Sequence, residues 1–203
     1  MKMERLLTLE KNLVKRRMTK IEQKKNLRKQ MLSVRGDLSE AYRIQASKKI
    51  WEKIYELPMY QNAETVYLYL SYQSEVDTLQ QIARILQDKK KLAVPKVTSE
   101  RQMTFFYIRG MMDVRSGYRG ILEPVTTQEA DGTECILLVP GTAFDKKLYR
   151  MGYGGGFYDT YMKQHAGLCR IGMSFACQVV EALPLEDHDE RLTGIVTENR
   201  TLF

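Results

Sequence analysis

Hydrophobic and polar residues follow a helical period near the start of the chain. The apolar positions of the stretch 18–36, which fall on one side of a helix, are Ile21, Leu27, Met31 and Val34. Lysines and arginines, among them Lys24 and Arg28, occupy the other and more exposed side. This pattern predicts a basic amphipathic helix that ends near Gly36, because glycine is common just past a helix C-terminus.

Beyond this stretch, segments with strand character alternate with helical ones. Helices are predicted over residues 39–57, 78–88 and 156–165, the first with Ser39 as its N-cap and Pro58 past its end. Strands are predicted over residues 65–71, 91–95, 102–108, 135–139, 168–174 and 194–198. This alternation predicts a Rossmann-like α/β layered fold, with a largely parallel central sheet flanked by helices.

Basic residues concentrate at the start of the chain. The 203 residues include 32 Lys and Arg against 25 Asp and Glu, which gives a formal net charge of +7. Residues 1–35 alone carry +9, which leaves −2 for the remainder. A basic start on a slightly acidic domain is not the basic face of a duplex binder, so we expect no nucleic-acid partner. The basic start is either a tail or a cluster that binds an anionic ligand.

Residues 1–17 are predicted to be separable from the rest of the chain. Met18 opens the first predicted helix, so we expect an N-terminal extension over residues 1–17 and a single α/β domain over residues 18–203. No uncharged run approaches the roughly 18 residues of a membrane span, and no signal-peptide pattern comes after the first charges. The three cysteines form no Cys-x-x-Cys pair. We therefore expect a cytoplasmic protein with no membrane partner, either a monomer or a weak homodimer.

A glycine-rich segment follows the most apolar predicted strand, residues 135–139. It reads Gly-Tyr-Gly-Gly-Gly-Phe-Tyr-Asp over residues 152–159. Ligands of open parallel sheets bind beyond the carboxyl ends of the strands, and glycines let backbone N–H groups approach an anion at a helix N-terminus. The segment matches neither the P-loop nor the dinucleotide fingerprint. A tight turn explains one or two glycines, so four in five positions predict a ligand-binding loop.

Acidic residues beside this loop are candidate metal ligands. Asp159 lies one turn into the predicted helix, where it either stabilises the helix dipole or binds a hard cation beside phosphate oxygens. The stretch 186–190 offers a second acid, although its simplest interpretation is a solvated acidic loop. The chain has only His165 and His188 and no Gly-x-Ser-x-Gly motif, so a Ser-His-Asp triad is not expected.

Two adjacent motifs are the most specific in the chain: Pro-Gly-Thr-Ala-Phe-Asp at 140–145, and Arg-Met-Gly-Tyr-Gly-Gly-Gly-Phe-Tyr-Asp at 150–159. In combination they resemble the 5-formyltetrahydrofolate cyclo-ligase family, also called methenyltetrahydrofolate synthetases. Weaker agreement is found at residues 24–28, 69–78, 183–189 and 195–198. The resemblance spans residues 18–198 and implies a ligase that uses ATP and Mg²⁺ to convert 5-formyltetrahydrofolate, with or without a polyglutamate tail, to 5,10-methenyltetrahydrofolate, ADP and phosphate.

The resemblance also implies roles for individual residues. For ATP binding these are Lys24, Lys25, Arg28, Arg150, Gly152, Tyr153, Gly154, Gly155, Gly156, Phe157 and Tyr158. For folate binding they are Leu70, Glu75, Tyr118, Tyr153, Gly154, Gly156 and Phe157. Arg150 and Tyr153 are implied as catalytic residues, and Asp159 and Asp189 as Mg²⁺ ligands.

Four of these positions have a plainer interpretation as well. Lys24 and Arg28 also suit a solvated helix face, and Leu70 suits the core. Glu75 also suits a cap or an ion-pair partner of the next helix.

The implied reaction needs no covalent nucleophile. ATP phosphorylates the formyl oxygen, N10 of the folate then attacks the activated carbon, and phosphate leaves. Positioning and charge neutralisation are sufficient for such a transfer. Sugar-phosphate isomerases and CoA-transferases on a similar sheet are alternatives, but they need a catalytic acid/base pair or a glutamate nucleophile, and no ATP. A nucleotide- or RNA-binding module without turnover is a third, and its affinity would fall steeply with salt.

Overall fold

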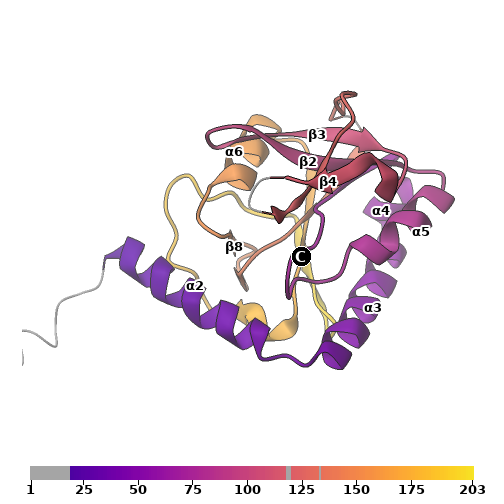
Figure 1. Cartoon of the computed structure of the whole chain (residues 1–203). Helices are drawn as coiled ribbons and strands as arrows, with labels where there is room; N and C mark the ends of the chain where they lie inside the picture. Colours follow the sequence, from indigo (N-terminus) through magenta and orange to yellow (C-terminus); the bar gives the residue numbers. More distant parts are fainter. Residues whose placement is uncertain (1–18, 118–119, 133) are drawn as a thin grey trace, which may run out of the picture.

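The computed structural model describes residues 19–203 apart from 118, 119 and 133, so the predicted extension 1–17 and Tyr118 lie outside the described residues. The helices are α2 (Lys20–Gly36), α3 (Glu40–Glu56), α4 (Pro58–Asn62), α5 (Ile82–Gln87) and α6 (Phe157–Gln164) (Figure 1). The strands are β1 (Thr65–Leu68), β2 (Lys91–Ser99), β3 (Gln102–Ile108), β4 (Val114–Ser116), β5 (Leu122–Pro124), β6 (Cys135–Val139), β7 (Ala143–Asp145), β8 (Arg150–Met151), β9 (Cys169–Met173), β10 (Val179–Val180), β11 (Gly194–Val196) and β12 (Thr201–Leu202). No helix among these has the length and apolar character needed to cross a bilayer.

Seven strands form the central sheet, in the order β12-β11-β9-β6-β1-β2-β3. The strands from β11 to β2 pair in parallel, while β12 and β3 pair antiparallel at the two edges. In the centre, Val66 of β1 lies beside Ile136 of β6, and Ile136 lies beside Cys169 of β9. The predicted α/β fold with a largely parallel sheet is confirmed.

The central strands are buried on both faces, as in other parallel sheets covered by helices. Because successive side chains point to opposite faces, Val66 and Leu68 pack in one core cluster with Trp51 of α3. Tyr67, between them, packs in a second cluster with Tyr161 of α6. Helices α3, α4 and α5 cover the first face and α6 covers the second (Figure 1).

The first predicted strand ends earlier than expected, at Leu68 rather than residue 71. The chain then leaves the sheet in a loop closed by Thr78, whose hydroxyl donates to the Tyr69 carbonyl at 2.7 Å and accepts from the Ser71 amide at 2.9 Å. This loop lies at the carboxyl end of β1, so the residues at its tip are positioned at that edge of the sheet. The helix predicted over 78–88 therefore begins as a 3-10 turn and becomes α5 only at Ile82.

A further predicted strand boundary was wrong, whereas the predicted signals at both ends of α3 are confirmed. Strand β2 continues to Ser99, because the antiparallel strand β3 pairs along its whole length. Pro58 lies past the end of α3 as predicted, and it also begins the short helix α4, a position that suits its fixed φ and its missing N–H. Ser39 caps α3 as predicted, accepting a hydrogen bond from the Tyr42 amide.

A small second sheet, in the order β10-β7-β8, was not predicted from the sequence. Asp145, at the end of β7, is fully buried and holds this sheet together. One carboxylate oxygen accepts from the amides of Lys147 and Tyr149 at 2.9 Å, and the other accepts from the amide of Leu183 at 3.0 Å. The last residue of the 140–145 motif thus closes the β7–β8 turn, which delivers Arg150 on β8 to the start of the glycine loop.

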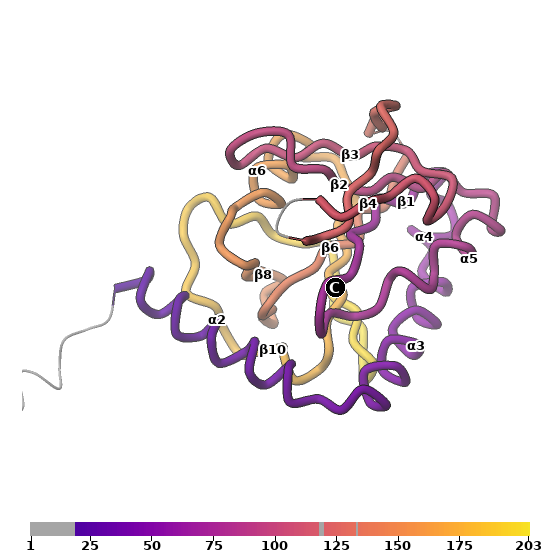
Figure 2. Tube along the Cα trace, in the orientation of Figure 1, coloured from indigo at the N-terminus to yellow at the C-terminus, as the bar shows by residue number. Residues whose placement is uncertain are grey.

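Helix α2 packs on this small sheet rather than on the central one. Met31 forms a core cluster with Ala143, Met151 and Leu183, and Figure 2 shows β10 beside the helix. Ile21, predicted to be on the apolar face, is 71% exposed because the first turn of α2 extends past this cluster. The packing places the middle and the end of α2 against the glycine loop.

Candidate functional site

The glycine loop, residues 152–156, connects β8 to α6 in a conformation that requires glycine. Gly154 has φ +106° and Gly156 has φ +71°, and both values are unfavourable for other residues. Gly156 is the N-cap of α6 and, having no side chain, makes no side-chain cap hydrogen bond to the helix. The backbone geometry accounts for two of the four glycines, and the uncapped helix end is a suitable place for an anion.

Arg28 of α2 contacts the loop directly. Its Nε donates to the Gly152 carbonyl at 2.8 Å, and its guanidinium group lies on the side of Gly154 where a side chain would project. Burial lowers the pKa of Arg28 from its usual value. Arg28 is half-buried against the loop, so the interpretation of a merely solvated helix face is wrong for this residue.

Lys24, one turn earlier on α2, contacts the acidic stretch near the C-terminus. Its Nζ lies 2.7 Å from Asp189 Oδ2 and 2.6 Å from Glu186 Oε2. Burial lowers the pKa of Lys24, but the hydrogen bonds that its ammonium group donates to the two carboxylates, together with their charges, outweigh this effect, so the pKa is raised overall. The side chain of Asp189 is only 8% exposed, which corrects the interpretation of a solvated acidic loop at this position. Lys25 is exposed, and its predicted role in ATP binding stays a prediction.

Arg150 and Asp159 form a second ion pair, buried beneath the loop. Arg150 Nη2 lies 3.1 Å from Asp159 Oδ2, with side-chain exposures of 3% and 14%. The guanidinium group also lies over the ring of Tyr158, 5.2 Å from its centre. Among the described residues, Nε makes no hydrogen bond, and Nη2 has Asp159 as an ion-pair partner without a hydrogen bond of suitable geometry. Buried donors without acceptors are rare and unfavourable, which points to a ligand that accepts from them.

The two candidate metal ligands belong to one region. Asp159 Oδ1 accepts from the amide of Glu190 at 3.3 Å, and Asp189 immediately precedes that residue. Carboxylate oxygens are the donors that Mg²⁺ prefers, and a site with few carboxylates is completed by phosphate oxygens and water. No group of three or more His, Cys, Asp or Glu residues suited to a metal is found within the described part of the chain. The pair therefore fits a magnesium ion that arrives with phosphates. We call Lys24, Arg28, Arg150, Asp159 and Asp189 the ion-pair cluster.

A second group lies at the other side of the loop, around Arg35. This residue, at the end of α2, is 1% exposed, and its Nη2 donates to the Tyr153 hydroxyl at 2.6 Å. Its Nη1 lies 3.9 Å from Glu75 Oε1, and its Nε donates to Ser74 Oγ at 3.0 Å. We call Arg35, Ser74, Glu75 and Tyr153 the Arg35 cluster.

Glu75 does not cap the next helix, which was its plainer interpretation. The acid that bonds the start of the following 3-10 turn is Asp77, whose carboxylate accepts from the Leu79 amide at 2.9 Å. Glu75 Oε2 accepts instead from the Tyr72 amide at 2.9 Å. Burial raises the pKa of Glu75, against the opposing effects of the Tyr72 amide and Arg35. A buried carboxylate with a raised pKa at the end of a parallel strand is typical of a ligand-recognition group.

The remaining predicted residues are less distinctive. Leu70 is buried in the core cluster that includes α3, as its plainer interpretation has it, and its predicted contact with folate stays a prediction. Phe157 packs at the edge of the second core cluster. Tyr158 lies under Arg150, and its buried hydroxyl has no hydrogen-bond partner in the part of the chain that the structure describes.

Arg35 was not predicted from the sequence. It follows Met31 by four residues and so continues the apolar side of α2, where a charged residue is unexpected. That exception to the pattern was the available signal.

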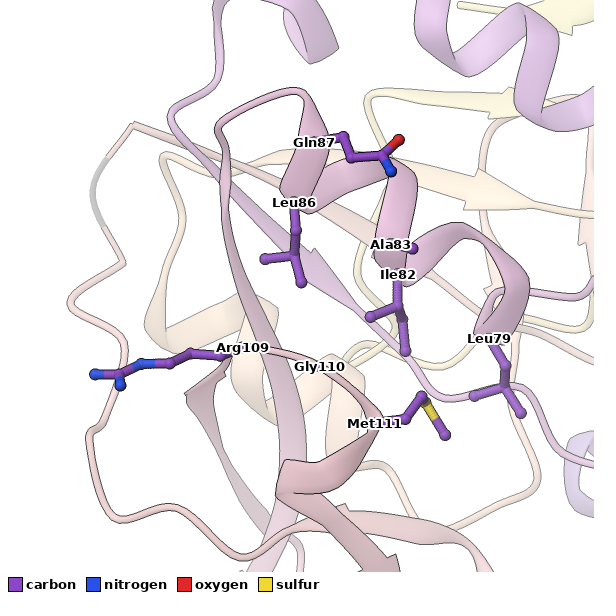
Figure 3. Close-up of a pocket in the computed structure, with 8 residues that line it drawn as sticks. All are labelled: Leu79, Ile82, Ala83, Leu86, Gln87, Arg109, Gly110 and Met111. Carbon is purple, nitrogen blue, oxygen red and sulfur yellow. The ribbon is translucent and has the colours of Figure 1, made fainter.

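A cavity of about 420 Å³ lies elsewhere, between α5 and the turn after β3 (Figure 3). It is lined mainly by apolar side chains, including Leu79, Ile82, Leu86 and Met111. The one charged lining residue, Arg109, points away from the others. The cavity contains none of the predicted site residues and lacks convergent polar groups, so it does not define the functional site.

The fold and the two clusters define a class of protein: an α/β protein with buried cationic side chains gathered at the carboxyl edge of its sheet. A family model described as the 5-formyltetrahydrofolate cyclo-ligase family matches residues 20–198. The chain belongs to this family, and it is accordingly a ligase.

Individual relatives agree with this assignment. A 5-formyltetrahydrofolate cyclo-ligase of Haemophilus influenzae is 27% identical over 186 residues, covering 86% of this chain and 97% of the relative. The solved 5,10-methenyltetrahydrofolate synthetase of Aquifex aeolicus is 31% identical, with a TM-score of 0.80 over 88% of this chain and 91% of that one. The Mycoplasma pneumoniae synthetase, at 24% identity and a TM-score of 0.70, covers 86% of this chain and 98% of its own and supports the fold alone.

Proposed function

We propose that this protein converts 5-formyltetrahydrofolate to 5,10-methenyltetrahydrofolate, with ATP as co-substrate and Mg²⁺ as cofactor. The observation that supports this most strongly is the buried guanidinium group of Arg150, which pairs with Asp159 under the glycine loop while its Nε and Nη2 make no hydrogen bond to any described residue. A phosphate oxygen is the acceptor that such a group suits best. Family membership supplies the substrate that the geometry alone leaves open.

The proposed chemistry consists of two displacements. The formyl oxygen attacks the γ-phosphorus of ATP, the bond from that phosphorus to the bridging oxygen breaks, and ADP leaves. N10 then attacks the formyl carbon and loses its proton, and the carbon–oxygen bond breaks with loss of phosphate. The phosphate therefore takes the formyl oxygen with it. Neither displacement needs a covalent intermediate on the protein.

The ion-pair cluster is proposed to bind the triphosphate by exchanging partners. Lys24 and Arg150 turn from Asp189 and Asp159 to phosphate oxygens, joined by Arg28 and by the backbone of the glycine loop. The two aspartates are then free to bind Mg²⁺. When bound, the metal would neutralise charge on the transferred phosphoryl group and orient it. Because each aspartate is held by a cation in the free protein, ATP and Mg²⁺ are expected to bind together.

The Arg35 cluster is proposed to face the folate. Glu75, when ionised, accepts hydrogen bonds from donors on the pterin ring, and Tyr153 lies between the folate and the nucleotide. Tyr118, implied in folate binding by the resemblance, keeps that role as a prediction. Cytoplasmic location, a tolerance for polyglutamate tails and a monomeric or weakly dimeric state are also retained as predictions.

The direct test is absorbance-monitored conversion of 5-formyltetrahydrofolate by the purified protein. We expect the methenyl product with Mg-ATP, none without ATP, and little with ATP in the presence of a chelator. Product formation that needs no ATP, or none at all from folded protein, would contradict the proposal. The first result would favour an isomerase- or transferase-like reaction instead.

A further inference from the structure

Arg35 connects three segments that are far apart in the sequence. In addition to Ser74, Glu75 and Tyr153, it reaches the Gly141 carbonyl from Nη1 at 3.4 Å. These partners belong to the loop after β1, the turn after β6 and the glycine loop. One fully buried guanidinium group therefore joins both loops that the proposed function assigns to folate.

We infer that Arg35 is a positioning residue of the folate subsite, holding the Glu75 carboxylate and the Tyr153 hydroxyl in one wall. This inference rests on the proposed function, because that function makes Glu75 and Tyr153 substrate-binding groups. Arg35 is not expected to touch the pterin itself. It acts through the two side chains in contact with it.

The burial of the cluster is unequal, and this argues against a role in the core alone. The guanidinium group of Arg35 is almost completely buried, while Tyr153 is 47% exposed. Arg35 thus contacts the exposed ring of Tyr153 from the protein interior. It donates a hydrogen bond to the hydroxyl, and its guanidinium group lies 5.8 Å from the ring centre. Burying an arginine is unfavourable unless its partners compensate. A purely structural link between these loops would not need a charge.

The positive charge of Arg35 acts to lower the pKa of the Glu75 carboxyl group, against the larger effect of burial. The titratable side chains that interact with Glu75 are Arg35, Tyr153, Tyr69 and Tyr158, of which only Arg35 is a cation. Burial raises the pKa of Glu75 and Arg35 opposes that rise. Without Arg35, Glu75 would take up a proton at higher pH, and a protonated carboxyl group accepts fewer hydrogen bonds from the pterin.

The experiment compares Arg35→Gln and Arg35→Lys with the wild-type protein. Arg84→Gln is the matched control, because Arg84 forms an exposed ion pair with Asp88 outside the site. The measured quantities are KM for 5-formyltetrahydrofolate, KM for ATP, kcat, and the pH dependence of kcat/KM for the folate. Thermal unfolding is followed in parallel.

For Arg35→Gln we expect the folate KM to rise about tenfold or more, the loss typical of a hydrogen-bonded charge, with the ATP KM changed less than about twofold. The acid limb of kcat/KM should move to higher pH. Arg35→Lys keeps the positive charge but loses the planar, forked set of N–H donors of the guanidinium group. The acid limb of its kcat/KM profile should therefore stay in place while the folate KM rises severalfold. A wild-type folate KM in Arg35→Gln, or an equal rise of both KM values with an unmoved acid limb, would overturn the inference.

Two further measurements keep the test decisive. If Arg35→Gln does not fold, Arg35→Lys and Tyr153→Phe decide, because each removes part of the Arg35–Tyr153 contact without leaving a buried cavity. A wild-type folate KM in both would overturn the inference. If the wild-type protein shows no turnover, the proposed function fails, while a fluorescence titration of folate binding in the absence of ATP still compares Arg35→Gln with wild type.

Discussion

The two clusters around the glycine loop differ in how their cations are held. In the ion-pair cluster, Lys24 and Arg150 each contact a carboxylate, Asp189 and Asp159, that is itself a candidate metal ligand. In the Arg35 cluster, the guanidinium group contacts one carboxylate at 3.9 Å and donates closer hydrogen bonds to neutral oxygens. In the ion-pair cluster, we expect that a phosphate could replace the carboxylate beside each cation and a metal ion could replace the cation beside each carboxylate. In the Arg35 cluster, the guanidinium group already has protein hydrogen-bond partners and needs no ligand.

From this difference we expect the two clusters to bind different substrates beside the same glycine loop. The exchangeable pairs suit a ligand that brings both negative charge and a cation, as Mg-ATP does, because each partner then finds a replacement. The fixed cluster suits a neutral heterocycle recognised by a carboxylate of set orientation. Substitutions in the two clusters should therefore change different substrate constants, and single-residue variants of the ion-pair cluster test that separation.

The largest effect is expected for Asp159→Ala. Loss of this carboxylate removes one proposed metal ligand and leaves Arg150 unpaired, so we expect kcat to fall at least about a thousandfold. Calorimetric titration should also show that ATP affinity no longer depends on Mg²⁺. Glu181→Ala is the control, because this exposed acid pairs with Lys146 on the surface. Wild-type activity in Asp159→Ala would remove the metal assignment.

Arg150→Lys should have the next largest effect. Lysine keeps the charge but replaces the fork of donors that Nε and Nη2 offer to a ligand, and kcat should fall about a hundredfold. The folate KM should change little, because Arg150 belongs to the ion-pair cluster. Steady-state kinetics, with Arg84→Lys as the exposed control, measure both constants. A twofold or smaller change in kcat would show that the fork is not used.

Arg28→Ala should change ATP binding and not folate binding. Arg28 joins the cluster through the Gly152 carbonyl and the loop, so its loss should weaken ATP binding about tenfold and leave the folate KM unchanged. Lys29→Ala is the matched control, since Lys29 is exposed on the same helix. Equal ATP affinity in the two variants would show that Arg28 does not contribute to ATP binding.

The smallest effect concerns pH and the Lys24–Asp189 pair. The pKa of Lys24 is raised above its usual 10.5 in the folded protein. Its contribution to stability is therefore fully present below 10.5 and is lost as the pH rises through the folded value. Denaturant unfolding of wild type and Lys24→Met should differ by a constant amount at neutral pH and by less above pH 10.5, with Lys25→Met as control. A difference independent of pH would show that the pair does not contribute.

The central sheet could be predicted because the sequence signals for its strands and helices lie between residues close together in the chain. The apolar strand 135–139, the Ser39 cap and the alternation of strands and helices each depend on near neighbours, and all were confirmed. The short strands of the second sheet are two or three residues long and have no period to detect. Their formation depends on Asp145, whose partners include an amide 38 residues away.

The site was predictable where a motif defined it and hidden where tertiary contacts did. Arg150, Asp159 and the glycine loop belong to one continuous motif, and the structure brings the first two together. The contact of Lys24 with Asp189 spans 165 residues, and the resemblance implied a site role for each residue without indicating that the two form a pair. Arg35 was missed because its burial depends on partners 39 to 118 residues away, which no local pattern records.

The most direct test of the proposed function traces the formyl oxygen. The substrate would be labelled with ¹⁸O in its formyl group and converted with Mg-ATP, and the inorganic phosphate would be analysed by mass spectrometry. We predict one labelled oxygen in the phosphate for each methenyl product formed, because phosphorylation of the formyl oxygen makes it part of the leaving group. Unlabelled phosphate, with the label released to water, would contradict the mechanism and the role assigned to the ion-pair cluster.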